Sequence, residues 1–239
     1  MVSISFALLG ALVGGLIGLG LSYSTIKEIM RIYRTPTDPI SALPLGGQVE
    51  VSGTAQSEFD DVRSPVTQTV CVLWRTEILE HHHSGRSGYD EQIFLDTSSH
   101  PFEVDDGTGQ IKVFPSDADL ILSDDLDRGS GMWDPLDTET AAALERMGIS
   151  TTNDMGYKRY LKVHEHYVKS GEPIYVLGEL KDQSGNRTIT SDQDAPLIIS
   201  DHSQQGTLDA LYWRLARAVF GSAVPGALIL FVLSNPRSR

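Results

Sequence analysis

The sequence predicts an α+β protein, namely a β-rich antiparallel sheet or partly closed, OB-like barrel with short helices, flanked by two transmembrane helices. Three observations lead to this fold class. Six or more short runs typical of strands lie between residues 47 and 205, separated by turns that contain glycine. Residues 4–21 carry no charge over 18 positions, which is long enough to cross a bilayer. A second apolar segment, residues 218–233, follows the strands.

These patterns divide the chain into five parts. We expect a first transmembrane helix, a juxtamembrane helix with a linker, a soluble β-rich domain, a second juxtamembrane helix and a second transmembrane helix, at residues 1–24, 25–46, 47–205, 206–217 and 218–234.

The first apolar segment is interpreted as a retained anchor. No Lys or Arg precedes it and no small-residue cleavage site follows, so a signal peptide is disfavoured. Gly10, Gly14 and Gly18 recur every four residues and would form one smooth stripe on a helix. Such a stripe lets another helix approach closely, either the second segment or another copy of the chain. The alternative is that glycine is simply common in membrane helices.

The second apolar segment is shorter and contains Pro225. Extending it back to Leu215 reaches a spanning length only by including Arg217, whose side chain could snorkel to the interface. A re-entrant or surface-lying helix is therefore the alternative to a span. Basic residues flank the segments on the domain side, at Lys27, Arg31, Arg34, Arg214 and Arg217. This bias predicts a multi-pass protein of the cell membrane with a cytoplasmic domain.

The predicted domain is strongly acidic. Between residues 35 and 207 there are 30 Asp plus Glu against 12 Lys plus Arg, a formal charge of −18. Nucleic acid is therefore excluded as an expected ligand, because its phosphates would be repelled. Dense carboxylates with only 6 Lys in the chain resemble the surfaces of haloarchaeal proteins, where high salt screens self-repulsion. An ordinary acidic surface is the alternative.

Within the domain, alternation and turn residues predict the elements in order. After a Pro- and Gly-rich loop to residue 47, we expect strands at 47–55, 67–80 and 91–95, with the histidine-rich residues 81–90 as an exposed loop. A hairpin should join 102–104 to 111–114 through the turn DDGTG.

The second half of the domain begins with an expected acidic loop at residues 117–131. Asp137 should cap a short helix that Gly148 ends. Residues 157–168 fit a strand or a helix, and three further strands are expected at 174–181, 186–190 and 197–200.

No pattern in the sequence predicts a catalytic residue, a cofactor or a bound metal. HExxH, GxSxG and Walker motifs are absent from the sequence. Cys71, the one cysteine, lies in an apolar run and should be an inert buried thiol, which leaves no pair of Cys for a zinc site. His164 and His166 would share one face of a strand with Glu165 pointing away, yet no third ligand follows at a recognisable spacing.

Trp133 is the residue with the clearest claim to partner binding. It lies in GSGMWDPLD among Gly, Asp and Pro, without core periodicity. The alternative is that its ring fills a local pocket.

Four phrases carry a family resemblance: GQVEVSGTA (47–55), WRTEILEHH (74–82), PFEVDDGTGQIKVFP (101–115) and YVKSGEPIYVLGEL (167–180). Together they resemble the GIDE family, whose eukaryotic members are membrane-anchored RING-type E3 ubiquitin ligases of the mitochondrial outer membrane. In those ligases zinc-bound Cys and His of a RING recruit the conjugating enzyme. This sequence has one Cys and reaches Arg239 soon after the second apolar segment, so no ligase residue carries over. The resemblance implies the membrane-side domain, a module for recognising partners.

Three functions stay open on this basis. The first is a two-pass membrane protein displaying a non-catalytic scaffold or recognition domain to membrane lipid and unidentified protein partners. The second is a component of ubiquitin-like modification that uses a RING from another chain. The third is a membrane-organising OB protein of the NfeD type, which a closed five-stranded barrel would favour.

The glycine stripe generates a prediction about assembly. Replacing Gly14 by Leu should disturb helix association in the membrane, because the larger side chain keeps the partner helix away. Crosslinking between the apolar segments and the oligomer size in detergent measure this effect. If both stay unchanged in the variant, the stripe is not a contact surface.

Overall fold

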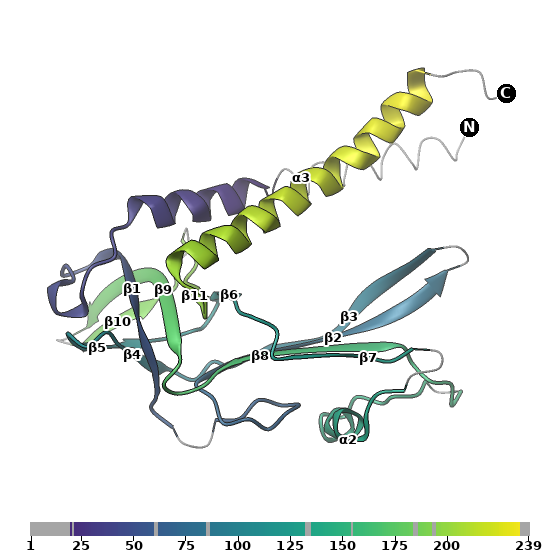
Figure 1. The fold of residues 1–239 in the computed structure, drawn as a ribbon, viewed down its shortest axis with the longest axis horizontal. Helices are drawn as coiled ribbons and strands as arrows, with labels where there is room; N and C mark the ends of the chain where they lie inside the picture. Colours follow the sequence, from purple (N-terminus) through teal and green to yellow (C-terminus); the bar gives the residue numbers. More distant parts are fainter. Residues whose placement is uncertain are drawn as a thin grey trace. The chain divides into compact units, whose positions relative to one another are not determined.

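The computed structural model describes residues 20, 22–59, 62–84, 87–131, 135–153, 155–183, 186–192 and 195–234, with the backbone alone at residues 84, 87, 183 and 220–234 (Figure 1). The chain divides into two compact units. One combines Met1–Pro36 with Gln204–Arg239, and the other is Thr37–Ser203.

Five strands of the second unit close into a barrel. Their order around it is β1–β4–β5–β10–β9, and β9 pairs with β1 to complete the circle (Figure 1). The strands are β1 Gly47–Ser57, β4 Phe102–Asp105, β5 Gln110–Val113, β9 Pro173–Gln183 and β10 Asn186–Thr190. All pairs are antiparallel except β5 with β10, which are parallel. The OB-like barrel that the sequence predicts is confirmed in this closed five-stranded form.

Two short strands extend the barrel sheet beyond β9. β11 (Ile198–Ser200) pairs with β9, and β6 (Asp119–Ile121) pairs with β11 in parallel. The antiparallel pairing that the sequence predicts therefore has two exceptions, the parallel pairs β5–β10 and β6–β11. Both pairs join strands far apart in sequence, so no local turn signal specifies their direction.

The barrel interior is apolar, as the alternation of its strands predicts. Val49 and Val51 of β1 are buried, and so are side chains from every other barrel strand, including Phe102, Val113, Val176 and Ile189. Gly178 lies opposite Val49 and leaves room for the neighbouring side chains. A methyl group at that position would lie 2.5 Å from Leu197 Cδ1 and 2.6 Å from Ile189 Cγ2.

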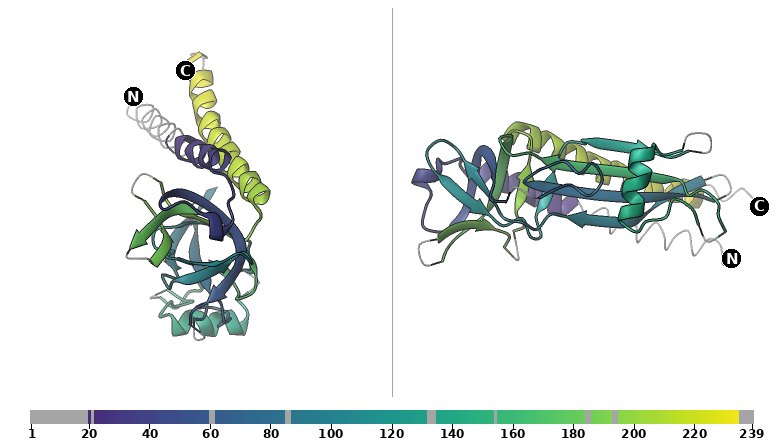
Figure 2. Two further views of the ribbon diagram at one scale, coloured as in Figure 1. Left: turned by 90° about the vertical axis from the view of Figure 1, so that its left-hand side faces the viewer. Right: turned by 90° about the horizontal axis from the view of Figure 1, so that it is seen from below.

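A separate four-stranded antiparallel sheet has the order β3–β2–β8–β7. Its strands are β2 Leu73–Ser84, β3 Ser87–Thr97, β7 Leu126–Gly129 and β8 Leu161–Val168. Helix α2 (Thr138–Arg146) lies across these strands (Figure 2). Ala143 and Leu144 of α2 pack with Ile78, Leu161 and Val163 in a second apolar core. Two insertions in the barrel build this layer, one between β1 and β4 and the other between β5 and β9.

In the histidine-rich segment, residues 81–84 and 87–90 are paired strand residues, which corrects the expectation of an exposed loop. β2 and β3 stay paired from Arg75 opposite Thr97 to Ser84 opposite Ser87. His82 stacks on Tyr89 across the strands at a ring distance of 5.1 Å, and His81 faces Asp90. Such cross-strand contacts stabilise a ribbon whose residues look polar and loop-like in the sequence.

Two further segments become strands. The expected acidic loop at 117–131 contains β6 and β7, which belong to different sheets, so that expectation is wrong. Residues 157–168, which fit a strand or a helix, form β8 from Leu161 onwards. The expected strand at 67–80 begins only at Leu73, because Gln68 has a positive φ of 58° within a turn.

Both local turn and cap predictions are confirmed. In the β4–β5 hairpin, Asp106 Oδ1 accepts hydrogen bonds from the backbone N–H groups of Thr108 and Gly109, while Gly107 has a φ of 81°. Asp137 caps α2 by accepting a hydrogen bond from the N–H of Thr140. Gly148, with a φ of 76°, follows the end of that helix.

The other unit is helical where it is described. Residues 22–34 form a helix, and α3 runs without a break from Gln204 to Ser234. The Tyr33 and Tyr212 hydroxyls lie 3.3 Å apart, and Arg214 Nη1 lies 3.4 Å from Glu28 Oε2. Most of the first expected span, with Gly10, Gly14 and Gly18, lies outside the described residues. Among the helices that are described, none combines the length and the apolar character that a bilayer crossing requires.

The tight packing around Gly178 generates the second prediction. Gly178→Ala should lower the free energy of unfolding by about 1–3 kcal/mol, because buried Leu197 and Ile189 must move. Thermal unfolding of the full chain in detergent measures the change. Gly46→Ala is the matched control, since its methyl group would lie at an ordinary 3.6 Å from Leu180 O. Equal melting of the two variants would contradict the predicted close packing.

Candidate functional site

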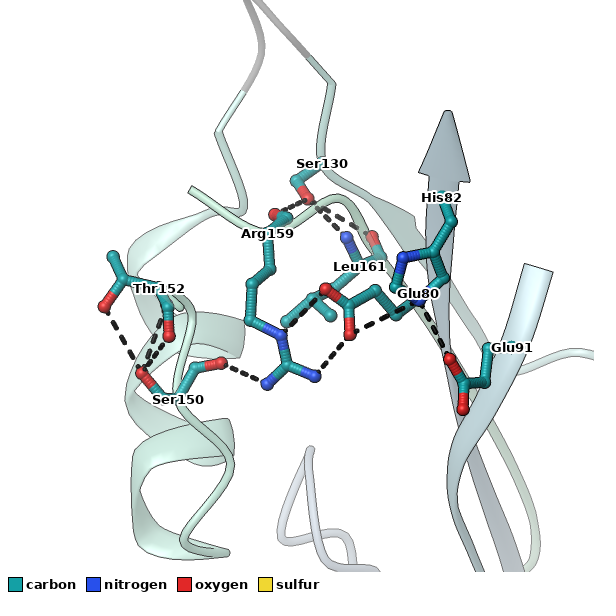
Figure 3. Close-up of polar contacts among 8 residues, drawn as sticks. All are labelled: Glu80, His82, Glu91, Ser130, Ser150, Thr152, Arg159 and Leu161. Carbon is teal, nitrogen blue, oxygen red and sulfur yellow. Dashed lines mark hydrogen bonds and ion pairs between the residues drawn. The ribbon is translucent and has the colours of Figure 1, made fainter. Parts of the chain in front are cut away.

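A polar network surrounds Arg159, next to the β2–β3 hairpin (Figure 3). Arg159 donates to Glu80 through two nitrogens, from Nε to Oε1 at 3.0 Å and from Nη2 to Oε2 at 2.6 Å. Its third nitrogen, Nη1, donates to the Ser150 carbonyl oxygen at 2.9 Å. This fork ties the end of β2 to the segment that follows α2.

Glu80 lies directly opposite Glu91 on the paired strands, so two carboxylates share one face. Like charges in this position repel each other. Arg159 neutralises Glu80, and its hydrogen bonds hold the pKa of Glu80 below the ordinary value. His82 Nε2 lies 3.0 Å from Glu91 Oε2 and 3.8 Å from Glu80 Oε2, and makes no hydrogen bond to either carboxylate.

The Ser130 hydroxyl also belongs to the network and bonds to the backbone. Its Oγ accepts a hydrogen bond from the Leu161 N–H at 2.7 Å and donates to the Arg159 carbonyl oxygen at 3.1 Å. No described base approaches this hydroxyl, so it has the environment of a structural serine. The network around Arg159 thus joins β2, β3 and the start of β8 through ion pairs and backbone bonds.

The opposite face of the hairpin carries a second ion cluster. Asp90 accepts a hydrogen bond from Lys162 Nζ at 2.7 Å, and His81 Nδ1 also lies 2.7 Å from its carboxylate. The hydrogen bond from Lys162 has the largest effect and the contact with His81 the next largest, and together they hold the pKa of Asp90 below its usual range. The His83 ring lies edge-on to His81 at 4.7 Å and to Tyr160 at 5.1 Å.

His164 and His166 do not converge on a shared metal position. His164 Nδ1 lies 3.6 Å from Asp127, whereas His166 Nδ1 lies 3.3 Å from Asp124 and 2.9 Å from the Ser123 carbonyl oxygen. Throughout the described residues, no three His, Cys, Asp or Glu side chains are arranged to hold an ion. The two histidines therefore pair separately with the acidic segment around β7.

Glu165, between those histidines, points into the fold as the alternation of β8 predicts. It is fully buried. Its carboxylate accepts four hydrogen bonds, from the N–H of Val66, the N–H and hydroxyl of Thr67, and the hydroxyl of Thr76. Sequence analysis missed this role. The available signal was an acidic residue at an inward position of the strand, which requires bonding partners.

Cys71 lies near this carboxylate and is 1% exposed. Burial, reinforced by the charge of Glu165, raises its pKa to about 12. The thiol is therefore protonated at neutral pH and has no nucleophilic character. This confirms the interpretation of Cys71 as an inert core residue. Trp133, the other residue singled out by sequence, lies outside the described residues.

A comparison with protein families shows which family the chain belongs to. A family model described as GIDE, E3 ubiquitin ligase, matches residues 75–224. The chain belongs to the GIDE family. No curated protein and no solved structure matches the chain.

The GIDE match covers nearly all of the four-stranded sheet, all barrel strands except β1, and the first two-thirds of α3. It includes the complete network around Arg159 and the buried Glu165. The phrase GQVEVSGTA, which contributes to the sequence resemblance, forms β1 and lies before the matched region. In this GIDE protein the matched residues therefore form mainly the two sheets of the β-rich domain and the ion pairs that stabilise them.

The Arg159–Glu80 pair generates the third prediction. Arg159→Leu should lower the free energy of unfolding by roughly 1.5–3 kcal/mol at pH 7, because Glu80 loses a two-point charged partner. The pKa of Glu80 is lowered in the fold, so the stabilisation is complete above the ordinary pKa of 4.5 and is lost as the pH falls through the lowered value.

Thermal unfolding at several pH values measures this effect in the full chain. The difference between wild type and Arg159→Leu should shrink steadily below pH 4.5. Arg128→Leu is the control, since the Arg128 side chain has only exposed contacts, a 3.7 Å ion pair with Asp137 and a hydrogen bond to the Asp127 carbonyl oxygen, and its loss should change stability little. A difference between wild type and Arg159→Leu that stays constant with pH would contradict the assignment.

Proposed function

We propose that this GIDE protein is a non-catalytic recognition module held at the cell membrane by its two ends, with the β-rich domain on the cytoplasmic side. The observation that carries the proposal is how its reactive side chains are used. Arg159, Glu80, Ser130 and Glu165 are engaged in bonds that hold strands and turns together. Cys71 is a buried, protonated thiol.

Membrane attachment rests on the sequence. Residues 4–21 are uncharged over 18 positions, and basic residues flank both apolar segments on the domain side. The backbone of α3 carries residues 218–233 within one helix. These features support a two-pass anchor whose positive flanks favour the cytoplasmic face.

The family relationship favours a second candidate, a component of ubiquitin-like modification. GIDE proteins are related to E3 ubiquitin ligases. The one cysteine of these 239 residues is buried in the core, so zinc-bound RING ligands would come from outside these residues. Recognition of a target by this domain and transfer by a partner would then be separate tasks.

The closed barrel favours a third candidate, a membrane-organising OB protein of the NfeD type. Closure of β1 on β9 is the observation that supports it. The two insertions add a four-stranded sheet and a helix to that barrel, and the GIDE match covers them. We therefore rank this role behind recognition.

Two measurements test the recognition proposal. Full-length protein should stay with the membrane pellet after washes at high salt and alkaline pH, because the anchor is apolar. Purified in detergent and mixed with activating enzyme, conjugating enzyme and a ubiquitin-like modifier, it should transfer no modifier unaided. Recovery in the aqueous fraction would overturn the anchor, and unaided transfer would overturn the non-catalytic role.

A further inference from the structure

We propose that the free edge of β3 binds an extended, Lys- or Arg-containing segment of a partner protein as an added strand of the four-stranded sheet. This inference rests on the proposed recognition function and names its surface and ligand class. The ligand is an extended basic peptide, recognised through backbone hydrogen bonds and acidic side chains.

The geometry of the sheet provides the edge. β3 pairs with β2 on one side, and in the described residues no strand pairs with its other side. It is 11 residues long, whereas the edge strands β7 and β6 have only 4 and 3 residues. The barrel strands close on themselves and leave β3 as the long open edge of the described fold.

The edge lacks three features that prevent strand addition, namely short length, Pro and Lys. Natural edges are protected by short length, Pro, charged side chains and above all Lys, β-bulges or a covering element. β3 contains no Pro, no Lys and no Arg. Its one irregularity is a bulge at Ile93, opposite the step from Ile78 to Leu79. Paired segments of β3 lie on both sides of this bulge, so each can extend the ladder.

Side chains along β3 favour a basic ligand. Glu91 and Asp96 share one face of the sheet, since their partners Glu80 and Thr76 lie on the same side of β2. The Glu91 side chain is 58% exposed, and Tyr89, 56% exposed, lies on the same face. A Lys or Arg beside Glu91 would gain an ion pair, and an Arg beside Tyr89 could stack on its ring.

The other face of the edge differs. Asp90 is already paired with Lys162 and His81, and Leu95 is 46% exposed. An added strand sends alternate side chains to the two faces. The matching ligand therefore alternates basic residues, placed near Glu91 and Asp96, with apolar residues, one of them near Leu95.

Charge also decides against a second copy of this chain as the occupant. Two β3 edges side by side would bring together strands that each carry Asp90, Glu91 and Asp96 without a basic residue. The whole domain between residues 35 and 207 has a formal charge of −18. Self-pairing would add repulsion where a basic partner removes it.

Binding to defined peptides tests the proposal in the full chain in detergent. The probe is a nine-residue peptide with alternating Lys and Val. One control peptide replaces each Lys by Glu, and another keeps every Lys but carries N-methyl groups on alternate backbone amides. The Lys peptide should bind, and both controls should bind at least about tenfold more weakly, because strand addition needs charge and free amides.

Hydrogen exchange and two variants locate the site. The Lys peptide should slow exchange within residues 88–97. Asp96→Lys and Glu91→Lys should each weaken binding about tenfold. Glu145→Lys on exposed α2 makes the same charge change away from the edge and should bind as wild type does. Among the described residues, the one hydrogen bond of the Asp96 carboxylate is with the adjacent Thr97 N–H, so this variant should keep the fold even if Glu91→Lys does not.

Three results would overturn the proposal. Equal binding of the N-methylated peptide would show charge attraction without strand addition. Protection confined to other elements would place the peptide elsewhere. If, without any peptide, hydrogen exchange in β3 becomes slower as the protein concentration increases, a second copy of the chain is the occupant. Measurements at about 0.15 M and 1 M salt separate the screened charge contribution from the backbone ladder. Membrane attachment does not depend on β3, so this test can fail while the proposed function stands.

Discussion

Pairing of β1 with β9 is the contact on which the rest of the domain depends. Eight residue pairs, from Gly47 opposite Leu180 to Thr54 opposite Pro173, join the first strand of the domain to one more than a hundred residues later. This ladder closes the barrel around its apolar interior. It also fixes the ends of both insertions, because one insertion leaves after β1 and the other returns at β9. The four-stranded sheet is therefore built on a frame that the barrel strands hold in place.

Local chemistry made several elements predictable from sequence. Asp106, Gly107 and Gly109 specify the β4–β5 hairpin through bonds and dihedral angles within four residues, and Asp137 specifies the start of α2. Alternation of apolar residues was sufficient to place most barrel strands. The number and spacing of these strands predicted the OB-like barrel. Each short strand has one apolar face, and closing the sheet into a barrel buries all of these faces in one interior.

Elements that depend on distant partners were harder to predict. Residues 81–84 look like a solvated loop because their stabilising contacts, His82 with Tyr89 and His81 with Asp90, come from the opposite strand. The parallel pair β5–β10 joins strands separated by the whole second insertion. The same limit applied to the candidate site. Arg159 and Glu80 are 79 residues apart, so neither their residue types nor their spacing in the sequence predicted that they form a pair.

The buried Glu165 has a consequence for synthesis of the chain. It holds the turn at residues 66–67 through bonds that span 98 and 99 positions, so this turn can lock only after β8 exists. The β2–β3 hairpin has local pairs and can form as soon as residue 97 leaves the ribosome. Until β8 is complete, about seventy residues and several seconds later at typical translation rates, the nascent hairpin exposes both of its edges. Newly made chains are then vulnerable to edge-to-edge aggregation, and chaperone capture during this interval would protect them.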